Sequence, residues 1–178
     1  VDASYNYSGG KIDIPRCRFN FLDATVMGSG TVSQSGNALQ IDTRASIDNL
    51  KVQNLGTISK EIEGRLYGNA KARLALSFRP GDGEIADTLK GTCDFLITNG
   101  KVANTGVQNA LGIWLDSLKY KLKDLEFNTI SGSVSADRGN LDIRTLVFNS
   151  PDVRVMVNGE VQKKKDLNAK LILEFNSN

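Results

Sequence analysis

The sequence predicts a mainly β fold: an antiparallel, strongly twisted or curved sheet of the meander or sandwich kind, with one short amphipathic helix near residues 105–118. The prediction rests on period-two alternation along most of the chain, on turn residues between the alternating runs, and on a single segment with helical spacing. With 178 residues the chain is long enough to bury a core. We therefore expect a single β domain spanning residues 1–178.

Alternation of apolar and polar residues is clearest between Leu39 and Ile47, where apolar or small side chains occupy the odd positions and Gln40 and Asp42 the even ones. Runs of the same kind cover residues 70–79, 153–161 and 167–175, and a shorter one begins at Cys17. A strand that alternates in this way has one buried and one wet face, which is typical of antiparallel rather than parallel sheets.

Turn residues separate the alternating runs, at residues 35–37, 80–83, 99–100, 138–140 and 150–152. The strongest hairpin signal is Asn99-Gly100, because both residues tolerate the positive φ of a type I′ turn. Gly28 and Gly30 indicate a bulge or a close backbone approach, since Gly28-Ser29-Gly30 lacks the spacing and the lysine of a phosphate-binding loop. Residues 31–42 loosely repeat in 133–143, as stacked hairpins of a β meander would.

One segment has helical rather than strand spacing. Its apolar stripe consists of Val107, Ala110, Leu111, Trp114, Leu115 and Leu118. We expect this helix to pack its stripe, including Trp114, against the sheet or across its end. A weaker helical pattern runs from Asp48 to Glu63, where Gly56 and β-branched neighbours oppose it.

Composition argues against most catalytic and nucleic-acid functions. The net charge is only +2, and the basic run Lys163-Lys164-Lys165 stands beside Asp166, as in a solvated turn. The chain contains no histidine, the commonest general base and transition-metal ligand. Most acidic residues fall on the expected wet faces of strands or in turns. We therefore expect no enzyme activity, no catalytic residue, no cofactor, no metal site and no nucleic-acid partner.

The two cysteines, Cys17 and Cys93, leave two interpretations open: a disulfide in an oxidising compartment, or two separate buried thiols. No stretch is long and apolar enough to span a bilayer as a helix, and the chain starts at Val1 without a signal peptide. We interpret the chain as a fragment of a larger protein.

Residues 89–175 resemble the C-terminal region of the AsmA family of bacterial envelope proteins. The strand-like segment 90–97 and the turn 98–102 resemble the family's glycine-led strand and the glycine turn before its helix. Residues 125–134 are similar to its phenylalanine-then-small-residue strand, and 138–143 to its glycine turn and outgoing strand. Asn158-Gly159-Glu160-Val161 resembles the glycine-bearing strand that precedes a closing strand, which here ends at Phe175.

The resemblance implies a function in envelope and outer-membrane biogenesis. AsmA-like proteins are similar to bridge-like lipid transporters, in which a long curved sheet forms an apolar groove for acyl chains. It implies a periplasmic location, with an inner-membrane anchor that is absent from this chain. The implied partners are phospholipid and other envelope proteins.

If the apolar sides of the strands together form a lipid groove, the two C-terminal alternating runs, 153–161 and 167–175, line it. The candidates are Val153, Val155, Val157, Val161, Leu167, Leu171, Leu173 and Phe175. Acyl chains would cover such a face at roughly 0.8 kcal/mol per buried methylene. The alternative is that the same side chains form a dry β-sandwich core in a non-catalytic structural module, which docks envelope partners through a strand edge. Alternation fits both interpretations.

Overall fold

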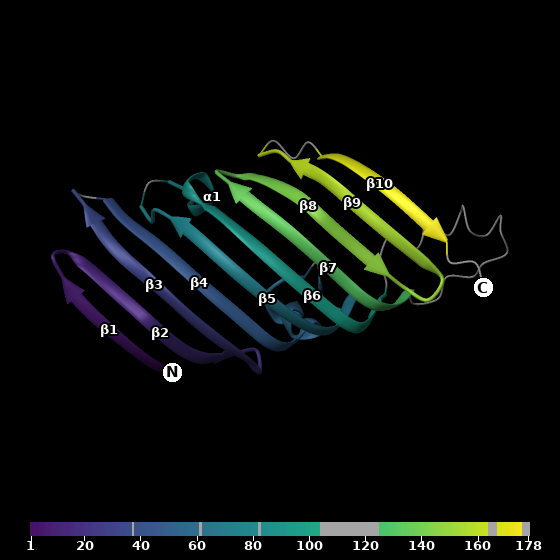
Figure 1. The fold of residues 1–178 in the computed structure, drawn as a ribbon, viewed down its shortest axis with the longest axis horizontal. Coiled ribbons are helices and arrows are strands. Elements are labelled where there is room, and N and C mark those ends of the chain that lie inside the picture. Colours follow the sequence, from purple (N-terminus) through teal and green to yellow (C-terminus); the bar gives the residue numbers. More distant parts are fainter. Residues whose placement is uncertain (37, 61, 82, 104–124, 164–166, 176–178) are drawn as a thin grey trace.

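The structure is a computed structural model that describes residues 1–36, 38–60, 62–81, 83–103, 125–163 and 167–175. Ten strands form a single antiparallel sheet in which each strand pairs with the next in the sequence. The strands are β1 Asp2–Ser8, β2 Lys11–Phe21, β3 Ala24–Ser35, β4 Ala38–Lys51, β5 Leu66–Phe78, β6 Lys90–Val102, β7 Leu125–Asp137, β8 Asn140–Asn149, β9 Val153–Val161 and β10 Leu167–Phe175. The predicted antiparallel meander is confirmed (Figure 1).

Two short helices lie among the described residues: the 3₁₀ helix η1, Val52–Thr57, and the single-turn helix α1, Ile85–Thr88. The weaker helical pattern of 48–63 therefore corresponds to η1, while residues 48–51 belong to β4. The helix expected near residues 105–118 lies outside the described residues.

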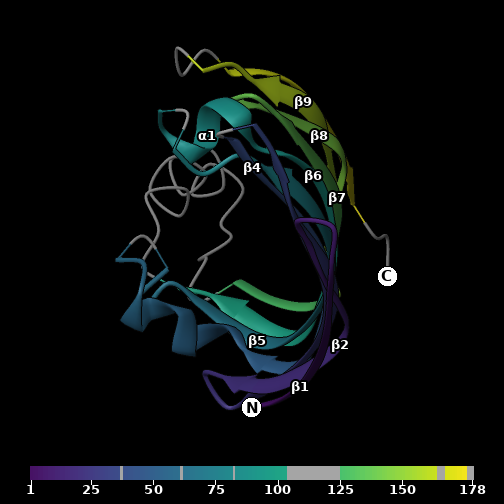
Figure 2. The ribbon, with the colours of Figure 1, turned by 90° about the vertical axis from the view of Figure 1, so that its left-hand side faces the viewer.

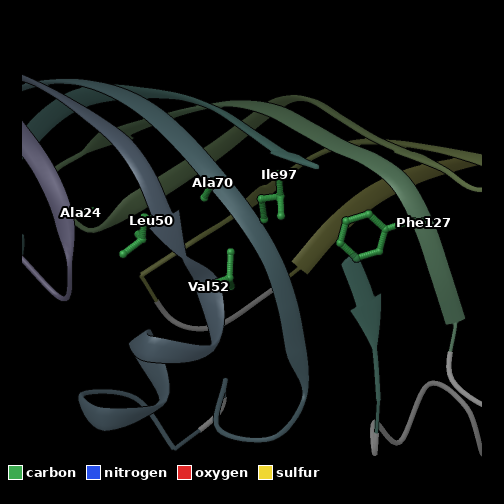
Figure 3. Packing of buried hydrophobic residues seen from close by; sticks show 6 residues of the cluster. All are labelled: Ala24, Leu50, Val52, Ala70, Ile97 and Phe127. Atoms are coloured by element: carbon green, nitrogen blue, oxygen red, sulfur yellow. The ribbon is translucent and has the colours of Figure 1, made fainter. Parts of the chain in front are cut away.

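The sheet is strongly bent, and its strands curve into an open arch in Figure 2. A small apolar cluster fills one end of the inside of this arch. Val52 of η1 packs there with Ala24, Leu50, Ala70, Ile97 and Phe127, all at most 8% exposed (Figure 3). We call the side of the sheet that carries these residues the concave face. Among the described residues there is one sheet, so the meander form of the prediction holds and the sandwich form does not.

Register places most apolar residues of the ten strands on the concave face, because directly paired residues of antiparallel strands project to the same side. From Ala70, for example, the pairing runs through Ile97 of β6 and Ile130 of β7 to Phe148 of β8. The polar positions pair with one another in the same way. Asp42 of β4, for instance, lies between Thr31 and Ser77.

Bulges keep this arrangement in phase along strands of up to 14 residues. β2, β4, β6 and β8 each carry one residue more than a neighbouring strand. After each extra residue, the concave face is occupied by even-numbered instead of odd-numbered positions of the strand, or the reverse. On β4, for example, Ile47 pairs with Ala72 but Leu50 pairs with Ala70. On β2 the shift falls at Pro15, a residue that suits a bulge because it has no N–H to donate.

The turn predictions are mostly correct. Residues 138–139 join β7 to β8 with positive φ at both Arg138 and Gly139, as in a type I′ turn. The hairpin predicted at Asn99-Gly100 is wrong, because both residues lie inside β6. The positive φ of Asn99, 50°, is used at the β6 bulge instead of in a turn. The β2–β3 turn at Leu22-Asp23 has no sequence signal, since leucine rarely adopts the φ of 49° that it has here.

The predicted hairpins at 31–42 and 133–143 are confirmed as β3–β4 and β7–β8. The prediction for Gly28 and Gly30 is also confirmed as a close backbone approach. A Cβ on Gly30 would lie 2.8 Å from the carbonyl oxygen of Asp42 on β4, and one on Gly28 would lie 3.0 Å from that of Arg44.

Candidate functional site

Most of the large exposed apolar side chains of the sheet lie on the concave face. At the end covered by η1 it is a closed core, where Val52 is 2% and Phe127 3% exposed. Towards the two outer edges of the sheet it opens. Phe175 on β10 is 70% exposed and Tyr7 on β1 is 70% exposed.

The C-terminal candidates lie on one face of the neighbouring strands β9 and β10. β9 and β10 pair without a bulge, so that Val153 lies opposite Phe175, Val155 opposite Leu173 and Val157 opposite Leu171. Val161 is the register partner of Leu167. Through Val155 and Phe148 the same face continues onto β8 and so to the η1 end.

The candidates on β9 and those on β10 differ in how far their side chains are exposed. The valines of β9 are half-buried, whereas Leu171 is 56% and Leu173 48% exposed on β10. A strand on the outer edge has a neighbour on one side only, so its side chains receive half of the lateral cover. β10 is therefore the part of the predicted set that presents most apolar surface to solvent.

The first half of the chain contributes a second exposed apolar area that the sequence analysis did not assign to any site. Ile12, Phe19 and Phe21 of β2 are each 37–38% exposed. They pair with Val32, Val26 and Ala24 of β3, which places them on the concave face. The alternation at Phe19 and Phe21 was visible in the sequence, but its side of the sheet depends on the β2 bulge.

Glycines shape the floor of the concave face by making room for rings. A Cβ on Gly132 of β7 would lie 2.5 Å from the ring of Phe95 on β6, so this ring lies over the glycine of the neighbouring strand. Gly100 likewise leaves space for the ring of Phe127. Phe127 also contacts Phe148, with ring centroids 5.6 Å apart and planes tilted by 60°.

The opposite face carries the polar positions and a shallow hollow of about 720 Å³ across β2–β6. Its walls are two polar rows of side chains, and its floor is the backbone of the row between them. The charged members of the walls are Asp13, Asp42, Arg44 and Lys90. Because both signs are mixed and the hollow is wide, this surface selects no particular charged ligand.

Both cysteines project to the concave face, Cys17 opposite Gly28 and Cys93 between Leu74 and Val134. Both thiols are free and half-buried, so of the two interpretations the structure has separate thiols. They stand on β2 and β6, with three strands between them. Burial, and secondarily the charge of Asp94, raises the pKa of the Cys93 thiol.

Three connections are tied together at the end of the sheet away from η1. Lys163, after β9, forms an ion pair with Asp87 of α1, and its backbone N–H donates to Oδ1 of Asn140. The backbone N–H of Arg138 donates to the carbonyl oxygen of Leu89. Asp87 raises the pKa of Lys163. These contacts join three strand connections to one another at the rim of the arch.

The described residues contain no group of three or more histidine, cysteine or acidic side chains arranged to hold a metal ion. In the same residues, no helix has the length and apolar character needed to cross a membrane. No protein-family model, curated protein or solved structure matches this chain.

Proposed function

We propose that the chain is a lipid-binding portion of an AsmA-like envelope protein, and that phospholipid acyl chains bind to its concave face. The observation that carries the proposal is the register, which places apolar side chains from all ten strands on one side of one bent sheet. On this proposal the protein works without catalysis, in the periplasm, held at the inner membrane by an anchor outside this chain.

The physical argument concerns what covers apolar surface. Side chains such as Leu171 and Phe175 are more than half exposed although they belong to the same face as the core. Large contiguous apolar patches on soluble proteins commonly mark binding surfaces. Acyl chains fit such a face because their binding needs no fixed polar partners and contributes roughly 0.8 kcal/mol per buried methylene.

The shape of the face agrees with a flexible aliphatic ligand rather than a compact one. The exposed part of the face combines valine, leucine and isoleucine side chains with separate aromatic rings on β2 and β10, those of Phe19, Phe21 and Phe175. It extends across neighbouring strands, which are spaced about 4.8 Å apart. Polar head groups would remain at the rim, where the connecting segments carry charged side chains such as Lys163 and Arg138.

Matched variants on adjacent residues test the proposal, because neighbours along a strand face opposite sides. Leu171→Asp places a charge on the concave face of β10, and Ile172→Asp places the same charge on the other side, where Ile172 is 41% exposed. Val155→Asp and Met156→Asp form the equivalent pair on β9, where both residues are half-buried.

The protein and its variants would be purified from a bacterial membrane background and analysed by native mass spectrometry, with extraction and identification of the bound lipid. We expect phospholipid on the parent chain and at least tenfold less on Leu171→Asp and Val155→Asp, with little change for their partners. Circular dichroism would establish that all four variants fold. A parent chain that carries no lipid, and takes none up from phospholipid vesicles, would replace the proposal with a structural or interaction module.

A further inference from the structure

We propose that α1 belongs to a hinged flap at the rim of the concave face, and that the ion pair between Lys163 and Asp87 latches this flap in place. The flap consists of residues 83–88, in the connection between β5 and β6. Its role in admitting acyl chains rests on the proposed lipid-binding function, whereas the latch itself can be measured on protein without lipid.

The two short helices lie at opposite tips of the arch, on either side of its open side (Figure 2). They differ in packing, because η1 contributes Val52 to the closed core while no residue of α1 is buried. Ile85 of α1 is 54% exposed. Burial of apolar side chains therefore does not fix α1, and its position depends on polar contacts.

The base of the flap is anchored on the sheet. The hydroxyl of Thr88 donates to the carbonyl oxygen of Arg79 and accepts from its backbone N–H, both at 3.1 Å. The carbonyl oxygen of the next residue, Leu89, accepts from the backbone N–H of Arg138 at 2.8 Å. These bonds close the connection where it leaves β5 and enters β6, so that a movement of α1 need not disturb either strand.

Two glycines precede α1 in the same connection. Gly81 and Gly83 have φ of 97° and 100°, in the left-handed region that glycine adopts without steric cost. Small residues that absorb large changes of φ commonly act as hinges. The flap can therefore rotate about its anchored base.

Lys163 is held in position to reach the flap from the end of β9. Its backbone N–H donates to Oδ1 of Asn140 at 3.1 Å. Its side-chain carbons lie over Gly139, where an added Cβ would approach them to 3.2 Å. From there Nζ forms the ion pair with Asp87. The side chains of Lys163 and Asp87 are 58% and 38% exposed, so water competes for both charges and the pair opens readily.

Opening of the latch changes access to the concave face. With the pair formed, α1 stays at its tip of the arch; with the pair broken, the flap swings on its glycines and an acyl chain passes α1 more easily. The apolar side chains that hold a bound chain are the same in both states. The latch therefore controls the rate of lipid exchange and leaves the amount bound at equilibrium unchanged.

Charge reversal tests the latch. Lys163→Glu and Asp87→Lys each replace attraction by repulsion, and the double variant restores the pair with its charges exchanged. Amide hydrogen exchange of residues 84–89, measured by mass spectrometry without lipid, should become at least fivefold faster in each single variant and return to the parent value in the double variant. The matched control is Arg154→Glu, which breaks a pair of similar exposure, 48% for Arg154 and 52% for Glu174, and should leave this exchange unchanged.

Lipid exchange is followed with phospholipid vesicles that contain NBD-labelled phosphatidylethanolamine. The rate of uptake should be at least threefold higher for the two single variants than for the parent. The double variant and Arg154→Glu should take up the label at the parent rate. The amount bound at equilibrium should be the same for all of these proteins, and circular dichroism would establish that each of them folds.

Unchanged hydrogen exchange in the single variants, or a double variant as fast as the single ones, would overturn the latch. Faster hydrogen exchange with an unchanged rate of uptake would overturn the role of the flap and leave lipid binding intact. A parent chain that takes up no labelled lipid would overturn the proposed function, and the role of the flap with it.

Discussion

The packing of Phe127 gives the sharpest test of the division between a closed core at the η1 end and an open face at the edges. Phe127 and Phe175 are the same residue type on the same face of the sheet, but Phe127 is 3% exposed and Phe175 is 70% exposed. Phe127→Ala removes a ring that packs against Ile97 and contacts Phe148 at 5.6 Å. Truncating a buried phenylalanine costs about 4 kcal/mol, of which the ring pair accounts for about 1 kcal/mol.

The measurement is urea unfolding followed by circular dichroism. With a slope of about 2 kcal/mol per molar urea, Phe127→Ala should lower the midpoint by about 2 M. Phe175→Ala should change the free energy of unfolding by less than about 0.5 kcal/mol, because the ring is already largely in water. Equal midpoints for the two variants would refute the argument, since they would mean that η1 does not close this end of the arch.

Two further predictions concern the same face. Gly132→Ala should lower the free energy of unfolding by about 1–3 kcal/mol, because the new methyl group meets the ring of Phe95 at 2.5 Å; Phe95→Leu in the same chain should recover part of the loss, and additive effects in urea unfolding would contradict the contact. The Cys93 thiol should be alkylated by iodoacetamide with its pH profile displaced upwards, because burial raises its pKa, and Asp94→Asn should lower that pKa part of the way. Because the pKa of Cys93 is higher in the folded than in the unfolded chain, the contribution of the protonated thiol to the free energy of unfolding is complete below the ordinary thiol pKa. It is lost as the pH rises through the raised pKa. An alkylation profile equal to that of a free thiol would contradict the raised pKa.

The sequence was sufficient to predict the antiparallel sheet, since alternation within each run reports directly on a strand with two unlike faces. It could not show how the runs align with one another. Between Ile47 and Leu50 the apolar residues of β4 change from odd-numbered to even-numbered positions. A prediction based on strict alternation interprets such a change as the end of a strand. The same difficulty explains the wrong hairpin prediction at Asn99-Gly100, because a residue that tolerates positive φ suits a bulge as well as a turn.

The candidate site was predicted only in part, for a related reason. Val153–Val161 and Leu167–Phe175 contain no parity change, so their shared face could be read from the sequence. The contribution of β2 was missed because Ile14 and Cys17 face the same side only through the bulge at residues 15–16.

The bulges connect the curvature of the sheet with the chemistry of its concave face. A bulge increases local twist and bends its strand, and here it also restores the apolar phase. On β8 the extra residue lies between Ile143 and Leu146; without it, Leu146 and Phe148 would project to the polar side and Phe127 would lose its ring partner. The same residue therefore bends the strand and keeps its apolar side chains inside the bend. This explains why an apolar face that continues across ten strands occurs on the inner side of an arch, where a flexible aliphatic ligand would be surrounded on more than one side.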